Sequence, residues 1–231
     1  MKKTFLLTVF SLFYFFNHAQ VIEKGKKILG GSLDFGFSHN QADTLASSGP
    51  SIKGGNSYLT LSPSFGKAIK NNMVFGYHAS AGFSHSKSKD LRLKTMGKTN
   101  GYSITAGIFW EKFFPLNKSF SFSGHVPLRI NYSSSKNKTF DNLVLLSTST
   151  NKFYGLGIYV SPSLNYSLNK KFLMQIFLND FISIGYGYNT SEMEGINLLK
   201  RKQSNSNLGV NTRINHFNTL SNLSFGFRYL L

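Results

Sequence analysis

The stretch KKILGGSLDFGFSHNQ, residues 26–41, alternates two kinds of residue. One parity carries large apolar side chains, which are Leu29, Leu33, Phe35 and Phe37, and the other carries small or polar residues, which are Gly30, Ser32, Asp34, Gly36 and Ser38. Successive side chains in a β-strand point to opposite faces of the sheet. The stretch therefore predicts a strand with one apolar face and one face of small polar residues.

The composition is that of a single β domain. The chain has 231 residues, no cysteine, 15% aromatic residues, 15% charged residues and a formal net charge of +17. This length suits one all-β domain better than two domains. The many phenylalanines and few charged residues exclude a disordered basic tail. The basic residues are not interleaved with aromatic stacking positions, so we expect no nucleic-acid partner.

The first twenty residues, MKKTFLLTVFSLFYFFNHAQ, have the layout of a secretory signal peptide. Lys2 and Lys3 precede an apolar run from Phe5 to Phe16, and a short polar stretch ends at Ala19. This run is shorter than the roughly 20 apolar residues of a membrane helix. We predict a signal peptide over 1–19 and a barrel domain over 20–231.

The two-residue alternation recurs along the mature chain. Seven further strands are predicted near 58–65, 75–84, 102–111, 120–132, 153–168, 172–189 and 220–231. Aromatic residues gather near the ends of these segments, at Trp110, Phe113, Phe114, Tyr132, Tyr154 and Tyr166. Rings at such positions are typical of the girdles that bridge lipid and water.

The predicted connections alternate between short and long. Short Asn/Lys turns occupy 68–73, 115–120 and 167–172, and long polar segments, read as loops, lie near 39–57, 85–100, 134–151 and 190–219. This alternation requires an even number of strands with both termini on the short-turn side. The sequence therefore predicts an all-β fold, an eight-stranded antiparallel up-and-down transmembrane β-barrel with its apolar face toward lipid.

A soluble β-barrel or sandwich is the alternative fold. Its solvent-facing parity would usually carry Lys, Glu and Thr. Here that parity is mostly Gly, Ser and Asn, which suits a narrow lumen filled by side chains. We therefore favour the membrane barrel.

Several segments together resemble a known family. They are EKGKKILGGSLDFGFS at the mature start, LSPSFG, AGIFWEKFFPLNKSFSF and the terminal LSFGFRYLL. The chain resembles the small outer-membrane β-barrel proteins of Bacteroidota, of the general OmpA/OmpX-like eight-stranded type. It departs from their pattern at Lys67 and Leu231, where such chains usually carry an aromatic residue. The resemblance implies a barrel in the outer membrane and, for most members, no defined activity.

Charged residues on the inward parity predict a polar network in the lumen. Its candidates are Asp34, Glu111, Arg129 and Arg228, and they are expected to pair because a narrow lumen leaves charges little water. Asp34 and Arg228 lie on the first and last strands, so we predict that they pair across the closing seam. A structural salt-bridge network is favoured over a gated pore.

Asp180 does not fit the alternation of its strand. It shares parity with Met174, Ile176, Ile182 and Ile184, so a regular strand would place its carboxylate toward lipid. A β-bulge at Asn179 or Asp180 would turn the side chain inward. The sequence leaves both possibilities open.

The segment HSKSKDLRLKTMGKTN, residues 85–100, is rich in cations. Its basic residues are Lys87, Lys89, Arg92, Lys94 and Lys98. A solvated loop with no dedicated partner is the favoured interpretation. In the alternative, a loop at an outer surface attracts the phosphates of lipopolysaccharide or other anionic polymers. The expected partners are outer-membrane lipid, lipopolysaccharide and the barrel-assembly machinery.

No motif fixes a nucleophile or a set of metal ligands. His39, His78, His85, His125 and His216 are accompanied by many serines, but no spacing singles out a catalytic set. We predict no catalytic residues, no metal, no cofactor and no enzyme activity. The expected function is a structural or surface-interaction role of a monomer in the outer membrane, through long extracellular loops. A narrow channel for small or hydrophobic solutes is the alternative, and a lipid-modifying enzyme ranks below it.

Overall fold

The computed structural model describes residues 22–43, 51–90, 94–141, 144–178, 180–195, 198–212 and 223–231. The predicted signal peptide, 1–19, lies outside these residues. The strands are β1 (Lys27–Asp43), β2 (Ser51–Lys70), β3 (Met73–Asp90), β4 (Thr95–Pro115), β5 (Phe120–Asp141), β6 (Val144–Ser167), β7 (Phe172–Leu178), β8 (Ile182–Gly195), β9 (Leu198–Thr212) and β10 (Leu223–Leu230).

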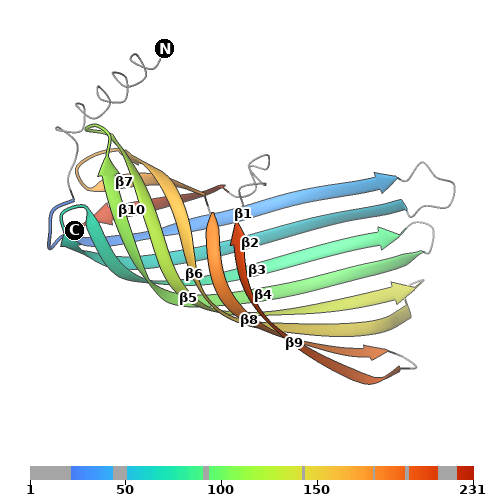
Figure 1. Ribbon diagram of the computed structural model, residues 1–231. Coiled ribbons are helices and arrows are strands. Elements are labelled where there is room, and N and C mark those ends of the chain that lie inside the picture. The colour runs from blue at the N-terminus through green and yellow to red at the C-terminus, as the bar shows by residue number, and fades with distance from the viewer. Residues whose placement is uncertain are drawn as a thin grey trace, which may run out of the picture.

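At the turn-end part of the molecule the strands form a closed antiparallel ring (Figure 1). Neighbours pair in the order β1, β2, β3, β4, β5, β6, β7 and β10, and β10 pairs again with β1. β8 continues β7 along the same side of β6, and β9 pairs with β8. The predicted eight-stranded antiparallel barrel is confirmed. Where the ring closes, its backbone groups are paired rather than exposed at an open sheet edge. Among the described residues, the edge of β1 that faces away from β2 beyond Leu33 and the edge of β9 that faces away from β8 have no partner strand.

The four predicted long loops are wrong over most of their length. In their place the strands run on as paired hairpins, with Asn40 opposite Gly54, Ser86 opposite Thr99, and Lys138 opposite Thr148. In the fourth segment, Ser191 lies opposite Gln203 and β9 occupies 198–212. These strands were missed because both of their faces are polar there, which removes the alternation without affecting backbone pairing.

The three predicted short turns lie at one end of the barrel, which we call the turn end, and the four hairpins form the opposite, hairpin end (Figure 1). In two turns an asparagine caps the chain in the same way. The Asn117 side chain accepts hydrogen bonds from the backbone N–H of Ser119 and Phe120, both at 2.8 Å. Asn169 does the same for Lys171 and Phe172, at 2.8 and 2.9 Å. This capping explains the repeated Leu-Asn-Lys sequence of these two turns.

The outer face of the ring carries an apolar band between two rows of aromatic rings. Toward the hairpin end, the row runs through Tyr102, Tyr132, Tyr154 and Tyr188, with ring centroids 5.1–6.4 Å apart. Toward the turn end, Phe75 packs on Trp110 at 5.3 Å and Phe120 on Tyr166 at 4.9 Å. Exposed aliphatic side chains such as Ile104 and Ile158 lie between the rows. A transmembrane barrel presents this arrangement to lipid.

One predicted girdle residue points the other way. Phe113 is 2% exposed and belongs to an apolar cluster inside the turn end. The cluster comprises Ile22, Ile28, Ala68, Val74, Phe109, Phe113, Leu173 and Leu230. Ile22 is held there because its N–H donates to the Asn72 side chain, and the Asn72 N–H donates to the Ile22 carbonyl, both at 2.8 Å. The segment before β1 thus helps to close the turn end.

No helix among the described residues combines the length and the apolar character needed to cross a membrane.

The apolar band predicts how the barrel tolerates charge. We expect Ile158→Arg, between the two aromatic rows of β6, to lower the free energy of unfolding by about 2–4 kcal/mol. Thr150→Arg, on the same face of β6 but beyond Tyr154, should change it by less than about 1 kcal/mol. Denaturant titration of protein folded into lipid vesicles measures both values, and equal losses would contradict the membrane level assigned here.

Candidate functional site in the barrel lumen

A buried carboxylate lies at the centre of the lumen. Glu111 of β4 is 1% exposed and accepts three hydrogen bonds. The Arg228 guanidinium of β10 donates to Oε2 at 2.9 Å, and the Gln175 amide of β7 donates to Oε1 at 3.0 Å. The Ser123 hydroxyl of β5 also donates to Oε1, at 2.9 Å. One anion therefore links four strands of the ring.

Further polar contacts extend this Glu111 network. The Gln175 amide also donates to Asn165 Oδ1 at 2.5 Å, and the hydroxyls of Ser123 and Ser163 lie 2.6 Å apart. Arg228 donates to the Ser64 hydroxyl and lies over the Phe109 ring, 5.5 Å from its centroid. The network consists of Ser64, Glu111, Ser123, Ser163, Asn165, Gln175 and Arg228. It fills the lumen directly beside the apolar cluster of the turn end.

Glycines on the lumen face make room for its large side chains. A Cβ at Gly30 would lie 2.5 Å from Cδ of Arg228, the residue directly opposite on β10. A Cβ at Gly76 would lie 2.7 Å from Cζ of Phe109. A side chain at either position would displace the group beside it. The small residues of the inward parity are therefore needed for the lumen to be filled.

A second ion pair lies nearer the hairpin end. Arg129 of β5 donates to Asp180 at 2.9 Å, and both side chains are about a quarter exposed, at 22% and 24%. The Arg129 guanidinium stacks on the Tyr159 ring, 4.6 Å from its centroid. Asn131 donates to the Tyr159 hydroxyl at 3.0 Å. This Arg129–Asp180 pair forms a second polar layer across the lumen.

A bulge between β7 and β8 turns Asp180 inward. β6 pairs with β7 as far as Ser163 opposite Phe177, and with β8 from Val160 opposite Ile182. The stretch 178–181 therefore spans the space of residues 161–162. Asp180 adopts a positive φ of 50°, and its N–H donates to the Ser161 hydroxyl at 3.1 Å. The inward alternative for Asp180 is the one the structure adopts.

The predicted pairing of Asp34 with Arg228 is wrong. Arg228 lies opposite Gly30, whereas Asp34 is four residues farther along β1, about 13 Å at the usual rise per residue. Asp34 instead contacts the hydroxyls of Ser224 and Ser32. Asp34 and Arg228 do lie on adjacent strands. The register of those strands decides which residues meet, and it keeps these two apart.

Of the four predicted lumen residues, the structure brings Glu111 and Arg228 together, pairs Arg129 with Asp180, and leaves Asp34 apart from both groups. The roles of Asp180 and Asn165 were missed. The inward parity of Asn165 in its strand was a usable signal, whereas the bulge that redirects Asp180 left only a break in the apolar pattern.

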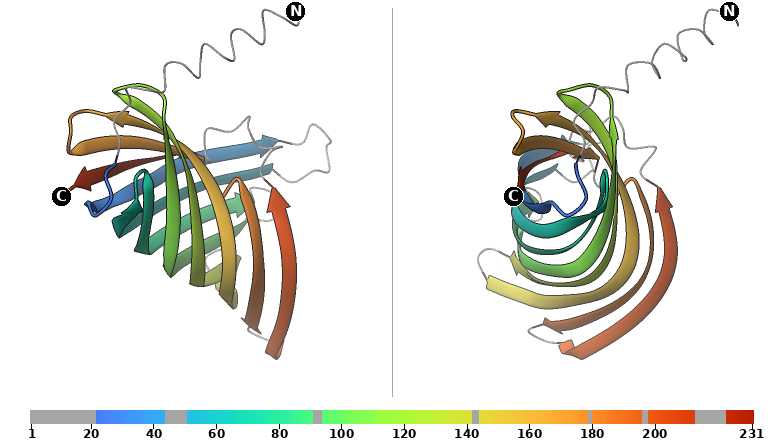
Figure 2. Two further views of the ribbon diagram at one scale, coloured as in Figure 1. Left: turned by 60° about the vertical axis from the view of Figure 1, so that its left-hand side comes forward. Right: turned by 90° about the vertical axis from the view of Figure 1, so that its left-hand side faces the viewer.

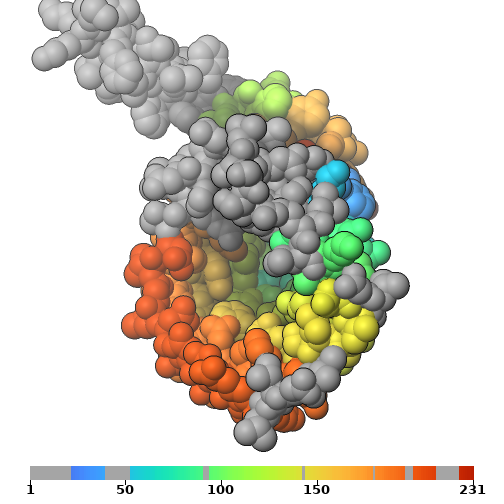
Figure 3. Space-filling view, turned by 90° about the vertical axis from the view of Figure 1, so that its right-hand side faces the viewer, coloured from blue at the N-terminus to red at the C-terminus, as the bar shows by residue number. Residues whose placement is uncertain are grey.

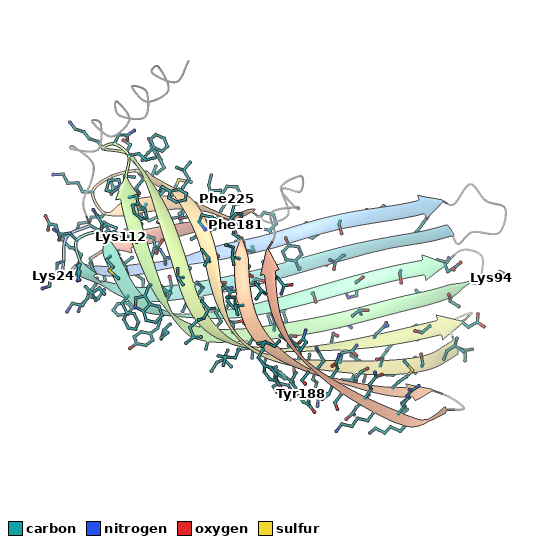
Figure 4. The ribbon with its side chains drawn as sticks, in the orientation of Figure 1. Lys24, Lys94, Lys112, Phe181, Tyr188 and Phe225 are labelled. Atoms are coloured by element: carbon teal, nitrogen blue, oxygen red, sulfur yellow. The ribbon has the colours of Figure 1, made fainter. Side chains whose placement is uncertain are left out.

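The prediction that the basic segment 85–100 is a loop is also wrong over most of its length. Lys87 and Lys89 belong to β3 and Lys98 to β4, so these cations stand on paired strands. Lys94 is exposed at the tip, with φ of 52°, and Arg92 lies outside the described residues. Figure 4 places Lys94 at the end of the molecule opposite Lys24 and Lys112.

Within the described ranges, no group of three or more His, Asp or Glu side chains could hold a metal ion. His125 Nδ1 lies 3.7 Å from Glu111, and its ring packs on Phe109 at 4.7 Å. These contacts join the histidine to the packed lumen.

No protein-family model matches the chain, and no curated protein matches it. Solved structures that resemble it include the outer membrane protein OprG from Pseudomonas aeruginosa, with 15% identity, a TM-score of 0.49, and coverage of 92% of this chain and 99% of that chain. A major outer membrane protein from Thermus thermophilus has 14% identity, a TM-score of 0.43, and coverage of 89% and 99%. The attachment invasion locus protein Ail of Yersinia pestis has 15% identity, a TM-score of 0.26, and coverage of 89% and 99%. The assignment of the fold rests on the chain's own strand register.

The buried ion pair predicts a specific double-mutant cycle. Arg228→Met leaves the Glu111 carboxylate buried without its cation, and should cost about 3–5 kcal/mol of unfolding free energy. Adding Glu111→Gln should recover part of this loss. The matched cycle of Arg228→Met with Asp34→Asn should be additive, because those residues do not meet. Coupling in the Asp34 cycle and none in the Glu111 cycle would contradict the register.

Proposed function

We propose that the chain is a monomeric outer-membrane protein that acts at its hairpin end, as a surface-interaction protein rather than a channel. In this proposal the segment 1–19 is the signal peptide for export, and the barrel-assembly machinery inserts the protein. The apolar band between two aromatic rows supports the membrane location. The likeness to Bacteroidota barrels of the OmpA/OmpX type stays a prediction from the sequence.

The filled lumen argues against the channel alternative. The apolar cluster around Phe109 and Phe113 occupies the turn end, and the Glu111 network lies against it. A hydrated ion would have to displace both the buried salt bridge and the rings. An eight-stranded barrel is wide enough for its own side chains or for one small ligand, but not for an aqueous channel, so we assign function to the outside and to the hairpin end.

The observation that carries the proposal is a set of lysines on the outer wall of the hairpins. We call Lys53, Lys87, Lys89, Lys98, Lys136, Lys138 and Lys152 the outer lysine row. Residues directly opposite in an antiparallel pair share a face. Lys53 lies opposite Lys89, Lys87 opposite Lys98, and Lys98 opposite Lys138.

Like charges placed directly opposite one another are destabilising. Among the described residues, Lys200 and Lys202 form ion pairs, both with Glu192. Lys98 of the outer lysine row lies over the Phe140 ring, 5.3 Å from its centroid. Among the side chains that the structure describes, we find no ion pair between the outer lysine row and a carboxylate. A polyanion outside the protein would remove the repulsion.

The distance of the outer lysine row from the tyrosine row indicates which polyanion we propose. On β4, Lys98 lies four residues beyond Tyr102, about 13 Å along the strand. A tyrosine row marks the lipid–water interface, so these cations stand at the level of headgroups and attached sugars. The phosphates of lipopolysaccharide are the anions that we expect there.

The test is binding of lipid A to the purified full chain in detergent. We expect the variant Lys87→Gln/Lys98→Gln/Lys138→Gln to bind bis-phosphorylated lipid A about tenfold to hundredfold more weakly than the unmodified protein, since each lysine near an anionic surface contributes about 1 kcal/mol. Lys24→Gln/Lys67→Gln/Lys112→Gln removes the same charge from the turn end and should bind normally. Isothermal titration calorimetry measures the affinities.

Two results would contradict this proposal. One is equal weakening by the two triple variants, which would indicate only net charge. The other is unchanged affinity for dephosphorylated lipid A, which would remove phosphate from the interaction.

A further inference from the structure

The hairpin end is hollow. Figure 3 looks onto this end and shows a depression between the hairpins of β3–β4 and β5–β6 and the hairpin of β8–β9. Figure 2 shows the same wall curving round from β3 to β9, and each neighbouring pair along it is hydrogen-bonded. We call the space inside this wall the outer chamber.

The outer chamber is closed below. The Arg129–Asp180 pair and Tyr159 form its floor, and the Glu111 network and apolar cluster lie between that floor and the turn end. The chamber therefore opens at the hairpin end and is closed toward the turn end, so a ligand that enters it would be bound rather than passed to the turn end.

The wall of the chamber is lined by amides and hydroxyls. The register places Asn131 and Asn137 of β5, Asn151 of β6, Asn189 of β8, and Asn205 and Asn207 of β9 on the inward face. Serine and threonine occupy many of the remaining inward positions. Each side-chain amide offers two donors and an acceptor, and each hydroxyl offers both functions. Such a surface matches a partner rich in hydroxyl groups.

The inward face of this wall is largely uncharged. On the described parts of β4, β5, β6 and β8, the inward positions between the floor and the tips carry no charged side chain. Charged residues of the same parity lie at the tips, at Asp90, Asp141 and Arg201. The Arg129 cation of the floor is paired with Asp180. Asp34 of β1 is an inward carboxylate outside this wall, and it contacts Ser224 and Ser32. The described part of the wall offers an anion no cation, and its uncharged amides and hydroxyls suit a neutral ligand.

Two aromatic rings lie against glycines of the wall. A Cβ at Gly187 would come within 2.6 Å of the Phe153 ring, and one at Gly155 within 2.8 Å. A Cβ at Gly157 would come within 3.1 Å of the Tyr159 ring. The missing side chains allow the rings to lie close to the backbone of β6 and β8. Aromatic faces beside amides suit sugar rings, which present C–H groups on one face and hydroxyls at the edge.

We propose that the outer chamber binds a neutral oligosaccharide, with Phe153 as a stacking platform and the inward asparagines as hydrogen-bonding partners. This site lies on the opposite face of the hairpins from the outer lysine row, so it is a second interaction of the same end of the molecule. The two can be tested separately, because each uses different residues and a different probe.

The experiment uses the folded full chain in an amine-oxide detergent, which has no sugar headgroup. The probes are maltohexaose and the tetramer of N-acetylglucosamine, with a hexagalacturonate as the charged counterpart. Saturation-transfer NMR reports contact, and titration calorimetry gives the affinity. We expect at least one neutral probe to bind at millimolar concentration or below, and the charged probe to bind at least about tenfold more weakly.

Variants assign the binding to the chamber. Phe153→Ala should weaken binding about fivefold to tenfold, in line with the loss of one aromatic contact. Asn151→Asp/Asn189→Asp places charges in the chamber without removing packed rings and should weaken binding at least as much. The matched control, Thr150→Asp/Thr190→Asp, carries the same charges on the outer face of the same strands and should leave binding unchanged.

Any of three results would overturn the proposal. These are no saturation transfer to either neutral probe, binding that the Phe153 and asparagine variants leave intact, and equal weakening by the control variant. Migration of unheated protein on gels verifies that each variant is folded, so loss of binding is not confused with loss of the barrel.

Discussion

The burial of one carboxylate constrains the whole barrel. Glu111 is removed from water inside a ring of strands, so its charge must be met by groups from other strands. Arg228 meets it from β10, the strand that closes the ring against β1, while Gln175 and Ser123 reach it from β7 and β5. These contacts require the strand register that the backbone shows. The same contacts fill the space through which a solute would otherwise pass.

The environment of each face changes along the strands. Below the tyrosine row, the outer face is apolar and the inner face is packed around Glu111. Beyond that row the outer face carries lysines and the inner face carries asparagines and serines. The backbone ladder is continuous across the change, because strand pairing does not depend on side-chain polarity. The hairpins thus present two chemically distinct surfaces, one around the barrel and one inside it, and both proposals depend on this division.

Much of the fold follows from the two-residue period, and the errors have physical causes. The apolar parity around Leu33 and Phe35 identified the exposed outer face of the barrel, and the Asn-Lys turns identified the end at which the chain reverses sharply. The hairpins beyond the tyrosine row were taken for loops because polar residues occupy both parities there. Phe113 was assigned to the girdle although its parity points inward.

The sequence predicted which charged residues face the lumen, but not which of them pair with one another. Inward parity selected Glu111, Arg129 and Arg228, but pairing across the lumen depends on strand offset, which a sequence does not display. The prediction therefore paired Asp34 with Arg228, which lies opposite a position about 13 Å away along β1. The partner of Arg129 could not be assigned because a bulge with a positive φ at Asp180 reorients that side chain.

The central claim is that side chains seal the barrel, and ion conductance across planar bilayers tests it most directly. The account predicts no steady conductance from the full chain, and measurable conductance once Glu111→Ala, Arg228→Ala and Phe109→Ala together empty the lumen. Steady conductance by the unmodified protein, unchanged in the triple variant, would contradict it.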